Sequence, residues 1–267
     1  MNLEQFTQHV LTLLQREYPT RGFRSGEELG VITDGVATFG MSNLFAQFQQ
    51  IQAQQSELDE NEFTRAIIEK FGDAMRIVDE AESPIPENWD EAREKLRVQL
   101  VNARVAAQGQ AITFPFSDDV YSSLVIDCDR GYAYVNQDDL ERWGLSAVDA
   151  IEIGKKNVVL AQPALPMAVM RGDSPLVSIQ TGDGYDAARV LIEPIRARII
   201  AELTGDEDGV VYAAVPNRDF LIAWPTDLDA DVHQRLCDTV ANDARKRSHP
   251  LSERILRLSK QTIEMAF

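Results

Sequence analysis

The chain has little of what builds a disulfide framework or a zinc site. Its 267 residues include only 2 cysteines and 3 histidines. Cys128 and Cys237 form no CxxC pair, and His9, His233 and His249 show none of the spacings of a zinc motif such as HExxH. We therefore expect no metal, no cofactor and no disulfide, and a reducing compartment, which indicates the cytoplasm.

Long apolar runs are also missing. No stretch approaches the roughly 18 consecutive apolar residues that a membrane-spanning helix requires. The N-terminal sequence, which begins Met1-Asn2-Leu3-Glu4-Gln5, has neither the basic residues nor the apolar run of a signal peptide. We expect a chain that neither spans nor is anchored in a membrane. Its 44% of apolar residues is enough to build a core without cross-links.

Positive charge is scarce. The chain has 26 lysines and arginines against 43 aspartates and glutamates, a formal net charge of −17. Nucleic acid and anionic lipid surfaces would be repelled at long range, so we expect neither as a partner. A basic protein would be attracted. The acidity is equally explained by solubility alone, and the oligomeric state is left open.

Apolar spacing and turn chemistry predict an irregular series of helices and strands. Helices are expected at residues 3–14, 44–51, 63–78, 96–107, 146–159, 188–203 and 232–244, with Pro194 kinking or splitting the sixth. Strands are expected on both sides of Asp34-Gly35 and at 124–127, 132–136, 164–170, 176–181, 210–215 and 220–224. This pattern predicts an α+β fold with mixed or antiparallel sheets covered by helices. Both halves contain a hairpin followed by helices, which leaves two similar halves open.

After Gly109 the pattern changes from helical spacing to strand-like runs, which predicts two regions. Residues 1–111 form an N-terminal α+β region of helix, hairpin and helices, and residues 112–267 form a C-terminal α+β region. The clearest linker is the segment 80–88, which holds Pro84 and Pro86.

A set of short motifs recurs in a recognisable order through the second region. They are Asn136, Trp143-Gly144-Leu145-Ser146, Lys156-Asn157-Val158, the segment 182–189, Val215-Pro216-Asn217-Arg218-Asp219 and His249-Pro250-Leu251-Ser252. In this order the chain resembles the bacterial YtpQ family over roughly residues 118–255. The resemblance implies a soluble cytoplasmic bacterial protein of α+β build, and it implies no reaction.

The segment 182–189 is the best candidate for a site, because a glycine-spaced acidic turn leads into an apolar helical stripe. Asp183 and Asp186 could bind a hard cation, or the backbone amides with Arg189 could hold an anion. In the structural alternative, either aspartate caps the helix and Arg189 forms an exposed helical ion pair. Tyr185, inside this polar turn, is expected to be partly exposed and could line a pocket.

A second polar turn, Arg218-Asp219, separates two predicted strands. If the two turns are adjacent, Asp183, Asp186, Arg189, Arg218 and Asp219 form one polar cluster at the surface. Otherwise the pair is a solvated turn, which contributes only about 0 to 1 kcal/mol.

The sequence contains no complete set of acid, base and nucleophile, so we assign no catalytic residue. The leading hypothesis is a noncatalytic protein-binding or adaptor module, with a basic protein as one version of its partner. The alternative is a metal-assisted enzyme acting on a phosphate-containing substrate. There Asp183, Asp186 and Asp219 would be ligands, and Arg189 or Arg218 would stabilise the developing charge.

Overall fold

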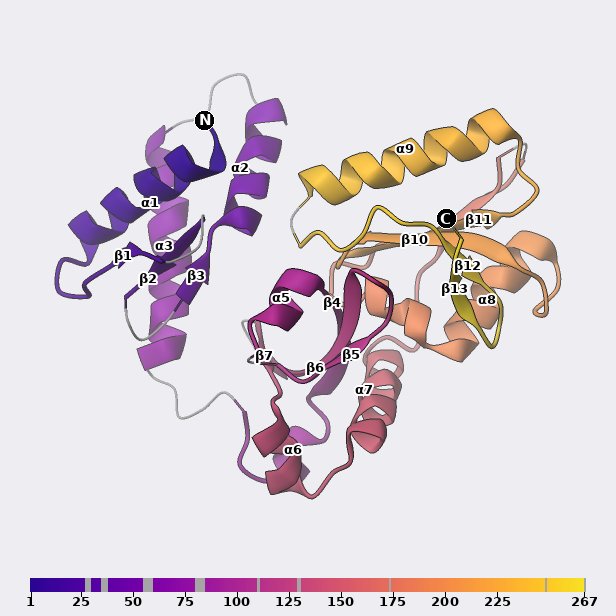
Figure 1. Cartoon of the computed structure of the whole chain (residues 1–267), viewed down its shortest axis with the longest axis horizontal. Coiled ribbons are helices and arrows are strands. Elements are labelled where there is room, and N and C mark those ends of the chain that lie inside the picture. Colours follow the sequence, from indigo (N-terminus) through magenta and orange to yellow (C-terminus); the bar gives the residue numbers. More distant parts are fainter. Residues whose placement is uncertain are drawn as a thin grey trace. The chain divides into compact units, whose positions relative to one another are not determined.

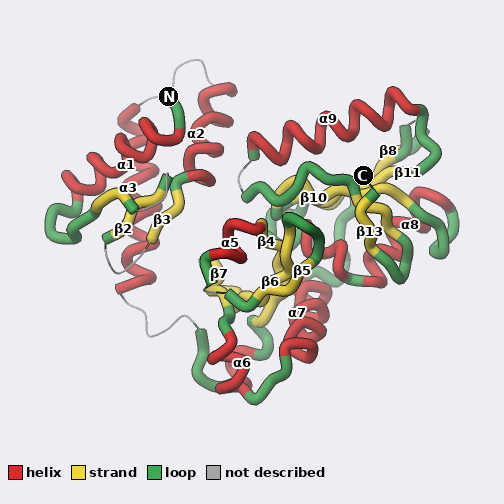
Figure 2. Tube along the Cα trace, in the orientation of Figure 1, coloured by secondary structure: helices red, strands yellow, loops and turns green. Residues whose placement is uncertain are grey.

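The chain is an α+β protein with antiparallel sheets (Figures 1 and 2), as predicted. The computed structural model describes residues 1–26, 30–34, 38–54, 60–79, 85–109, 111–128, 131–172, 174–247 and 249–266. Two compact units are present. Unit 1 comprises Met1–Glu82 with Lys246–Ser248, and unit 2 comprises Ser83–Arg245 with His249–Phe267.

Unit 1 packs three helices against a small sheet. Its elements are α1 (Leu3–Glu17), β1 (Arg24–Ser25), β2 (Val31–Thr33), β3 (Thr38–Gly40), α2 (Ser42–Gln54) and α3 (Glu60–Asp79). Asn2 begins α1 with a capping box, in which its side chain and that of Gln5 each accept the other residue's backbone N–H. The pairing of β2 with β3 confirms the predicted hairpin, whose turn residues 35–37 lie outside the described residues. The core gathers apolar side chains from all three helices and the sheet, among them Phe6, Leu14, Ile32, Phe48 and Phe71.

The first sheet of unit 2 has four strands. The elements around it are α4 (Trp89–Ala92), β4 (Leu96–Asn102), α5 (Ala103–Ala107), β5 (Thr113–Pro115), β6 (Val120–Cys128), β7 (Gly131–Tyr134), α6 (Gln137–Trp143) and α7 (Ala147–Ala161). The strand order is β4-β6-β5, and β7 also pairs with β6. Helix α7 lies directly on β4, because a Cβ added to Gly154 would be 3.0 Å from the backbone nitrogen of Val98.

The second sheet of unit 2 has six strands in the order β13-β12-β10-β11-β9-β8. The elements here are β8 (Ala168–Met170), β9 (Leu176–Ile179), η1 (Ala187–Leu191), α8 (Glu193–Thr204), β10 (Val211–Asn217), β11 (Phe220–Pro225), α9 (Ala230–Lys246), β12 (Leu256–Leu258) and β13 (Ile263–Met265). One face packs against η1 and α8, and the other face packs against α9. Pro194 stands in the first turn of α8, so the predicted helix over 188–203 is split, not kinked.

Two predictions about this fold are wrong. The apolar stripe of Leu96, Leu100, Ala103 and Ala107 does not form one helix, because Leu96–Asn102 is strand β4. Residues four apart share a face in a strand as well as in a helix, so the spacing did not separate the two. The division between residues 111 and 112 is also wrong, since it would separate β4 from β6, which pair along seven residues.

The boundary between the units falls instead inside the predicted linker 80–88. Unit 1 has one sheet of three strands, whereas unit 2 has sheets of four and six, so the described elements do not form two similar halves. Among the described helices, none is long and apolar enough to cross a membrane.

Candidate functional site

The turn between β9 and η1 is organised by a buried carboxylate. Asp186 has an exposed fraction of 0%. Its carboxylate accepts hydrogen bonds from the backbone N–H and the hydroxyl of Thr181, both at 2.8 Å, and from the N–H of Gly182 at 3.3 Å. Asp186 makes no side-chain cap to η1. It therefore closes the turn backward onto β9 instead of capping the helix ahead, which corrects the capping role expected for it.

Arg189 lies beside this carboxylate and is also buried, with 1% of its surface exposed. Its Nη1 is 2.6 Å from Oδ1 of Asp186, and its Nη2 is 2.5 Å from Oδ2 of Asp183. Nη2 also donates to Oε1 of Gln162 at 3.0 Å. The predicted exposed ion pair is thus wrong. Because two carboxylates already surround the guanidinium, Arg189 has little capacity left for an anionic ligand.

The two aspartates differ in their electrostatics. Burial raises the pKa of Asp183, but hydrogen bonds from Arg189 and the N–H of Tyr185, with the charge of Arg189, outweigh it and leave the pKa below its ordinary value. For Asp186, burial raises the pKa, and its bonds to Thr181 and Gly182 and the charge of Arg189 offset this only in part. Asp183, about one-third exposed, is the more accessible of the two.

Tyr185 is buried, with an exposed fraction of 5%, so the expected partly exposed position is wrong. Burial, followed by the nearby charge of Asp127 and a hydrogen bond to it, raises the pKa of the Tyr185 hydroxyl. Oδ2 of Asp127 in turn lies 3.9 Å from Nε of Arg97. This connection between the turn that precedes η1 and the four-stranded sheet is not visible from sequence spacing.

The second turn forms its own ion pair. Arg218 donates from Nε and Nη2 to the two carboxylate oxygens of Asp219, at 2.8 and 3.2 Å. Its guanidinium lies 5.7 Å from the ring centroid of Tyr132 and donates to the Tyr132 hydroxyl at 3.4 Å. The arginine is therefore held by a carboxylate on one side and an aromatic ring on the other.

The two turns are adjacent, which was the condition for a single polar cluster. The N–H of Ala187 donates to the carbonyl of Arg218 at 3.0 Å, and a Cβ added to Gly184 would lie 3.6 Å from Nε of Arg218. Nevertheless, within the described residues no hydrogen bond or ion pair joins the charged side chains of one turn to those of the other. The five predicted residues form two separate ion-pair groups, one buried and one half-buried, instead of one surface cluster.

These groups do not make a metal centre. Within the part of the chain that the structure describes, no three His, Cys, Asp or Glu side chains are placed to hold a metal ion. Asp183 and Asp186 form ion pairs with Arg189, and Asp219 forms an ion pair with Arg218. Asp183, Asp186 and Asp219 are therefore not placed together as the ligand set that the metal-assisted alternative requires.

A cysteine and a histidine do meet on α9, but they are not arranged for nucleophilic chemistry. Nε1 of Trp224 donates to Nδ1 of His233 at 3.0 Å, which leaves the proton of a neutral imidazole on Nε2. That Nε2 lies 3.5 Å from Sγ of Cys237. Burial, followed by the charge of Asp238, raises the pKa of the Cys237 thiol. The histidine nitrogen facing the thiol is thus a donor and cannot remove its proton.

A different surface was not predicted. From the last turn of α7 to the end of β8, eight apolar residues are exposed: Val159, Leu160, Ala161, Pro163, Ala164, Pro166, Ala168 and Met170. Leu160 and Met170 expose 59% and 57% of their surfaces. We call residues 159–170 the apolar edge, because β8 is the end strand of the six-stranded sheet. The sequence signal was the lack of any charged residue between Lys156 and Arg171.

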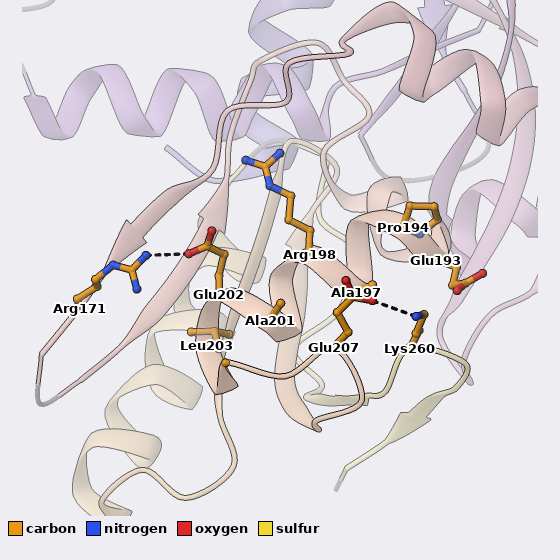
Figure 3. A pocket seen from close by; sticks show the side chains of 11 residues that line it. Arg171, Glu193, Pro194, Ala197, Arg198, Ala201, Glu202, Leu203, Glu207 and Lys260 are labelled. Carbon is orange, nitrogen blue, oxygen red and sulfur yellow. Dashed lines mark hydrogen bonds and ion pairs between the residues drawn. The ribbon is translucent and has the colours of Figure 1, made fainter.

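A groove of about 800 Å³ borders the apolar edge on its α8 side (Figure 3). Arg171 is paired with Glu202 at 2.8 Å, and Lys260 is paired with Glu207 at 3.0 Å. Figure 3 shows the guanidinium of Arg198 pointing away from both pairs. Nη1 of Arg198 donates to the carbonyl of Leu165 at 3.2 Å, which places this cation against the apolar edge.

The chain was compared with protein-family models, curated proteins and solved structures, and none of them matches. The resemblance to the YtpQ family therefore stays a prediction. Several residues that carry it have structural roles. Asn136 and Ser146 cap α6 and α7, Gly144 ends α6 with a φ of 67°, and Asn157 donates to the carbonyls of Arg93 and Leu96.

Proposed function

We propose that this protein is a noncatalytic, cytoplasmic protein-binding module whose binding surface is the apolar edge. The observation that carries the proposal is the exposure of eight apolar residues within the twelve residues 159–170. Contiguous exposed apolar surface bordered by polar residues is typical of a protein interaction site. Burying a side chain such as Leu160 or Met170 in a complex would contribute about 1.5 to 3 kcal/mol.

The state of the charged residues supports a noncatalytic role. An active site needs groups that are free to contact the substrate, with perturbed pKa values suited to proton transfer. Arg189 and Arg218 are each held by carboxylates of their own turn, and the histidine beside Cys237 is turned to donate. These groups stabilise the fold, and the binding role falls to the uncharged surface.

Two kinds of partner are distinguishable by salt. The net charge of −17 would attract a basic protein at long range, and that attraction would weaken as salt screens it. The apolar edge carries no charge of its own, so binding there would persist at high salt. We propose the apolar edge as the docking surface and treat a partner held by charge alone as the competing outcome.

The test compares two substitutions on the same helix. Leu160→Glu lies on the apolar edge, whereas Val148→Glu is a matched control at a residue that is 72% exposed near the start of α7. Each variant is used to capture proteins from a cytoplasmic lysate at low and high salt. We expect one partner to be retained at both salt concentrations by the wild type and by Val148→Glu, and to be lost with Leu160→Glu.

Retention by both variants would contradict the proposal, and so would a partner released from the wild type by salt alone. Thermal unfolding of all three proteins checks that they are equally folded. We expect equal stability, because both substitutions are at exposed positions.

A further inference from the structure

Strand β8 is an edge strand with one side that is not paired to another described strand. Among the described strands it is the last of its sheet, and it pairs with β9 alone, through Ala168 with Ser178, Val169 with Val177 and Met170 with Leu176. The other side of an edge strand presents backbone N–H and C=O groups that an extended peptide can pair with. A strand added there would continue the six-stranded sheet.

The two faces of β8 differ in chemistry. Met170 projects on the face that α9 covers over β10 and β11, and its 57% exposure shows that the cover does not extend to β8. Val169 projects on the opposite face, where it packs against the core that η1 and α8 share. Because side chains alternate along a strand, an added strand would place every second side chain beside Met170. Apolar residues fit that side.

The remaining side chains of an added strand would point toward the groove along α8. Arg198 lines that groove and donates to the carbonyl of Leu165, three residues before β8, and the structure describes no carboxylate partner for it. The groove's other charges are two cations and three carboxylates: Arg171 pairs with Glu202, and Lys260 pairs with Glu207. The remaining carboxylate, Glu193, lies on the side of Lys260 and not beside Arg198. Carboxylates fit this side.

Basic residues also flank the apolar edge along the chain. Lys156 is exposed one helical turn before Leu160, and Arg171 directly follows Met170. Arg171 is paired with Glu202, whereas the structure describes no carboxylate partner for Lys156 or Arg198. In a chain with a net charge of −17, these two cations place positive charge beside the apolar edge. Charge complementarity therefore favours an acidic segment over a basic one.

We propose that β8 binds an extended segment of a partner protein, with alternating apolar and carboxylate side chains, as an additional strand. This inference rests on the proposed function and names the chemistry of its partner. A lipid surface could meet the apolar and basic side chains, but it could not pair with the backbone of β8. Strand addition is therefore the favoured mode.

The probe is a short fluorescent peptide of alternating valine and glutamate with both ends blocked. Its binding is measured by anisotropy against the wild type, Met170→Glu, Arg198→Glu and, as a matched control, Arg16→Glu on the exposed side of α1. We expect saturable binding that weakens at least about fivefold in each of the first two variants and is unchanged in the control. A peptide of alternating valine and lysine should bind more weakly than the probe.

Hydrogen exchange separates strand addition from other modes. The bound probe should slow exchange of backbone amides in residues 168–170. Absence of saturable binding, binding without protection of β8, or equal binding of the lysine peptide would overturn the proposal. Association of the protein with anionic phospholipid vesicles instead of the peptide would also overturn it. If Leu160→Glu abolishes partner capture while the peptide fails, the protein-binding function stands and strand addition is rejected.

Discussion

Arg189 and Asp186 form an ion pair in which neither side chain exposes more than 1% of its surface, with Nη1 2.6 Å from Oδ1. The pair joins the turn after β9 to the helical segment η1. Its charges are further satisfied by Thr181, Asp183 and Gln162. A buried pair of this kind is costly to break, because removal of one partner leaves an uncompensated charge in the interior.

Arg189→Met should therefore destabilise the protein by about 3 to 5 kcal/mol. The measurement is the free energy of unfolding in urea. Arg218→Met is the matched control, because Arg218 and Asp219 expose 17% and 29% of their side chains and should contribute less. Equal losses in the two variants, or a loss below about 1 kcal/mol for Arg189→Met, would show that the buried pair has no special weight.

Asp183 should make stability depend on acid pH. The pKa of Asp183 is lower in the folded protein than in the unfolded chain. Its contribution to the free energy of unfolding is therefore complete above the unfolded-state pKa of about 4, and it is lost as the pH falls through the folded-state pKa. The pKa of Asp186 is raised on folding, so its ionisation lowers the free energy of unfolding as the pH rises. We expect Asp183→Asn to be less stable than the wild type near neutral pH, with the difference shrinking below about pH 4. A difference that is constant with pH would contradict this assignment.

Divalent cations should not stabilise the folded protein through the two polar turns. Their carboxylates are bonded to Arg189 and Arg218 and are not grouped as ligands. A thermal-shift series with magnesium, manganese and calcium should leave the melting temperature unchanged. A rise that disappears in Asp183→Ala would revive the metal-assisted alternative.

Gly154 should not tolerate a methyl group. Its added Cβ would lie 3.0 Å from the Val98 nitrogen and 3.1 Å from the Arg97 carbonyl carbon, and backbone atoms cannot move aside as a side chain can. We expect Gly154→Ala to destabilise by about 1 to 3 kcal/mol, although alanine is the better helix former. Lys156→Ala, on the exposed side of α7, should change stability by less than about 0.5 kcal/mol. A stabilised Gly154→Ala would mean that α7 can shift away from β4.

Local chemistry predicted much of the fold. The hairpins followed from turn residues, and the start of α7 followed from Ser146, which accepts the N–H of Asp149. The short strands β12 and β13 were missed, because three residues provide too little alternation to recognise. The strand β4 was predicted as a helix because its apolar residues fit the spacing of a helix as well as that of a strand.

The sequence identified the residues of the candidate site but not their burial. The sequence placed Arg218 between two paired strands, but the adjacency of the two turns depends on the pairing of β11 with β9, which the sequence left open. The burial of Arg189 could not follow, because it depends on Gln162 and on the packing of η1 against the sheets. Spacing along a chain identifies which charges are near in sequence, but only tertiary packing determines which are removed from water.

The shortness of β8 has a consequence for solubility. An apolar strand with an open side is an aggregation hazard, and a long one would let identical chains stack. Here Pro163 and Pro166 precede the strand and Arg171 follows it, so regular pairing is limited to three residues. Such flanking residues limit the stacking of identical chains, so the short strand that we propose as a docking edge offers little template for aggregation.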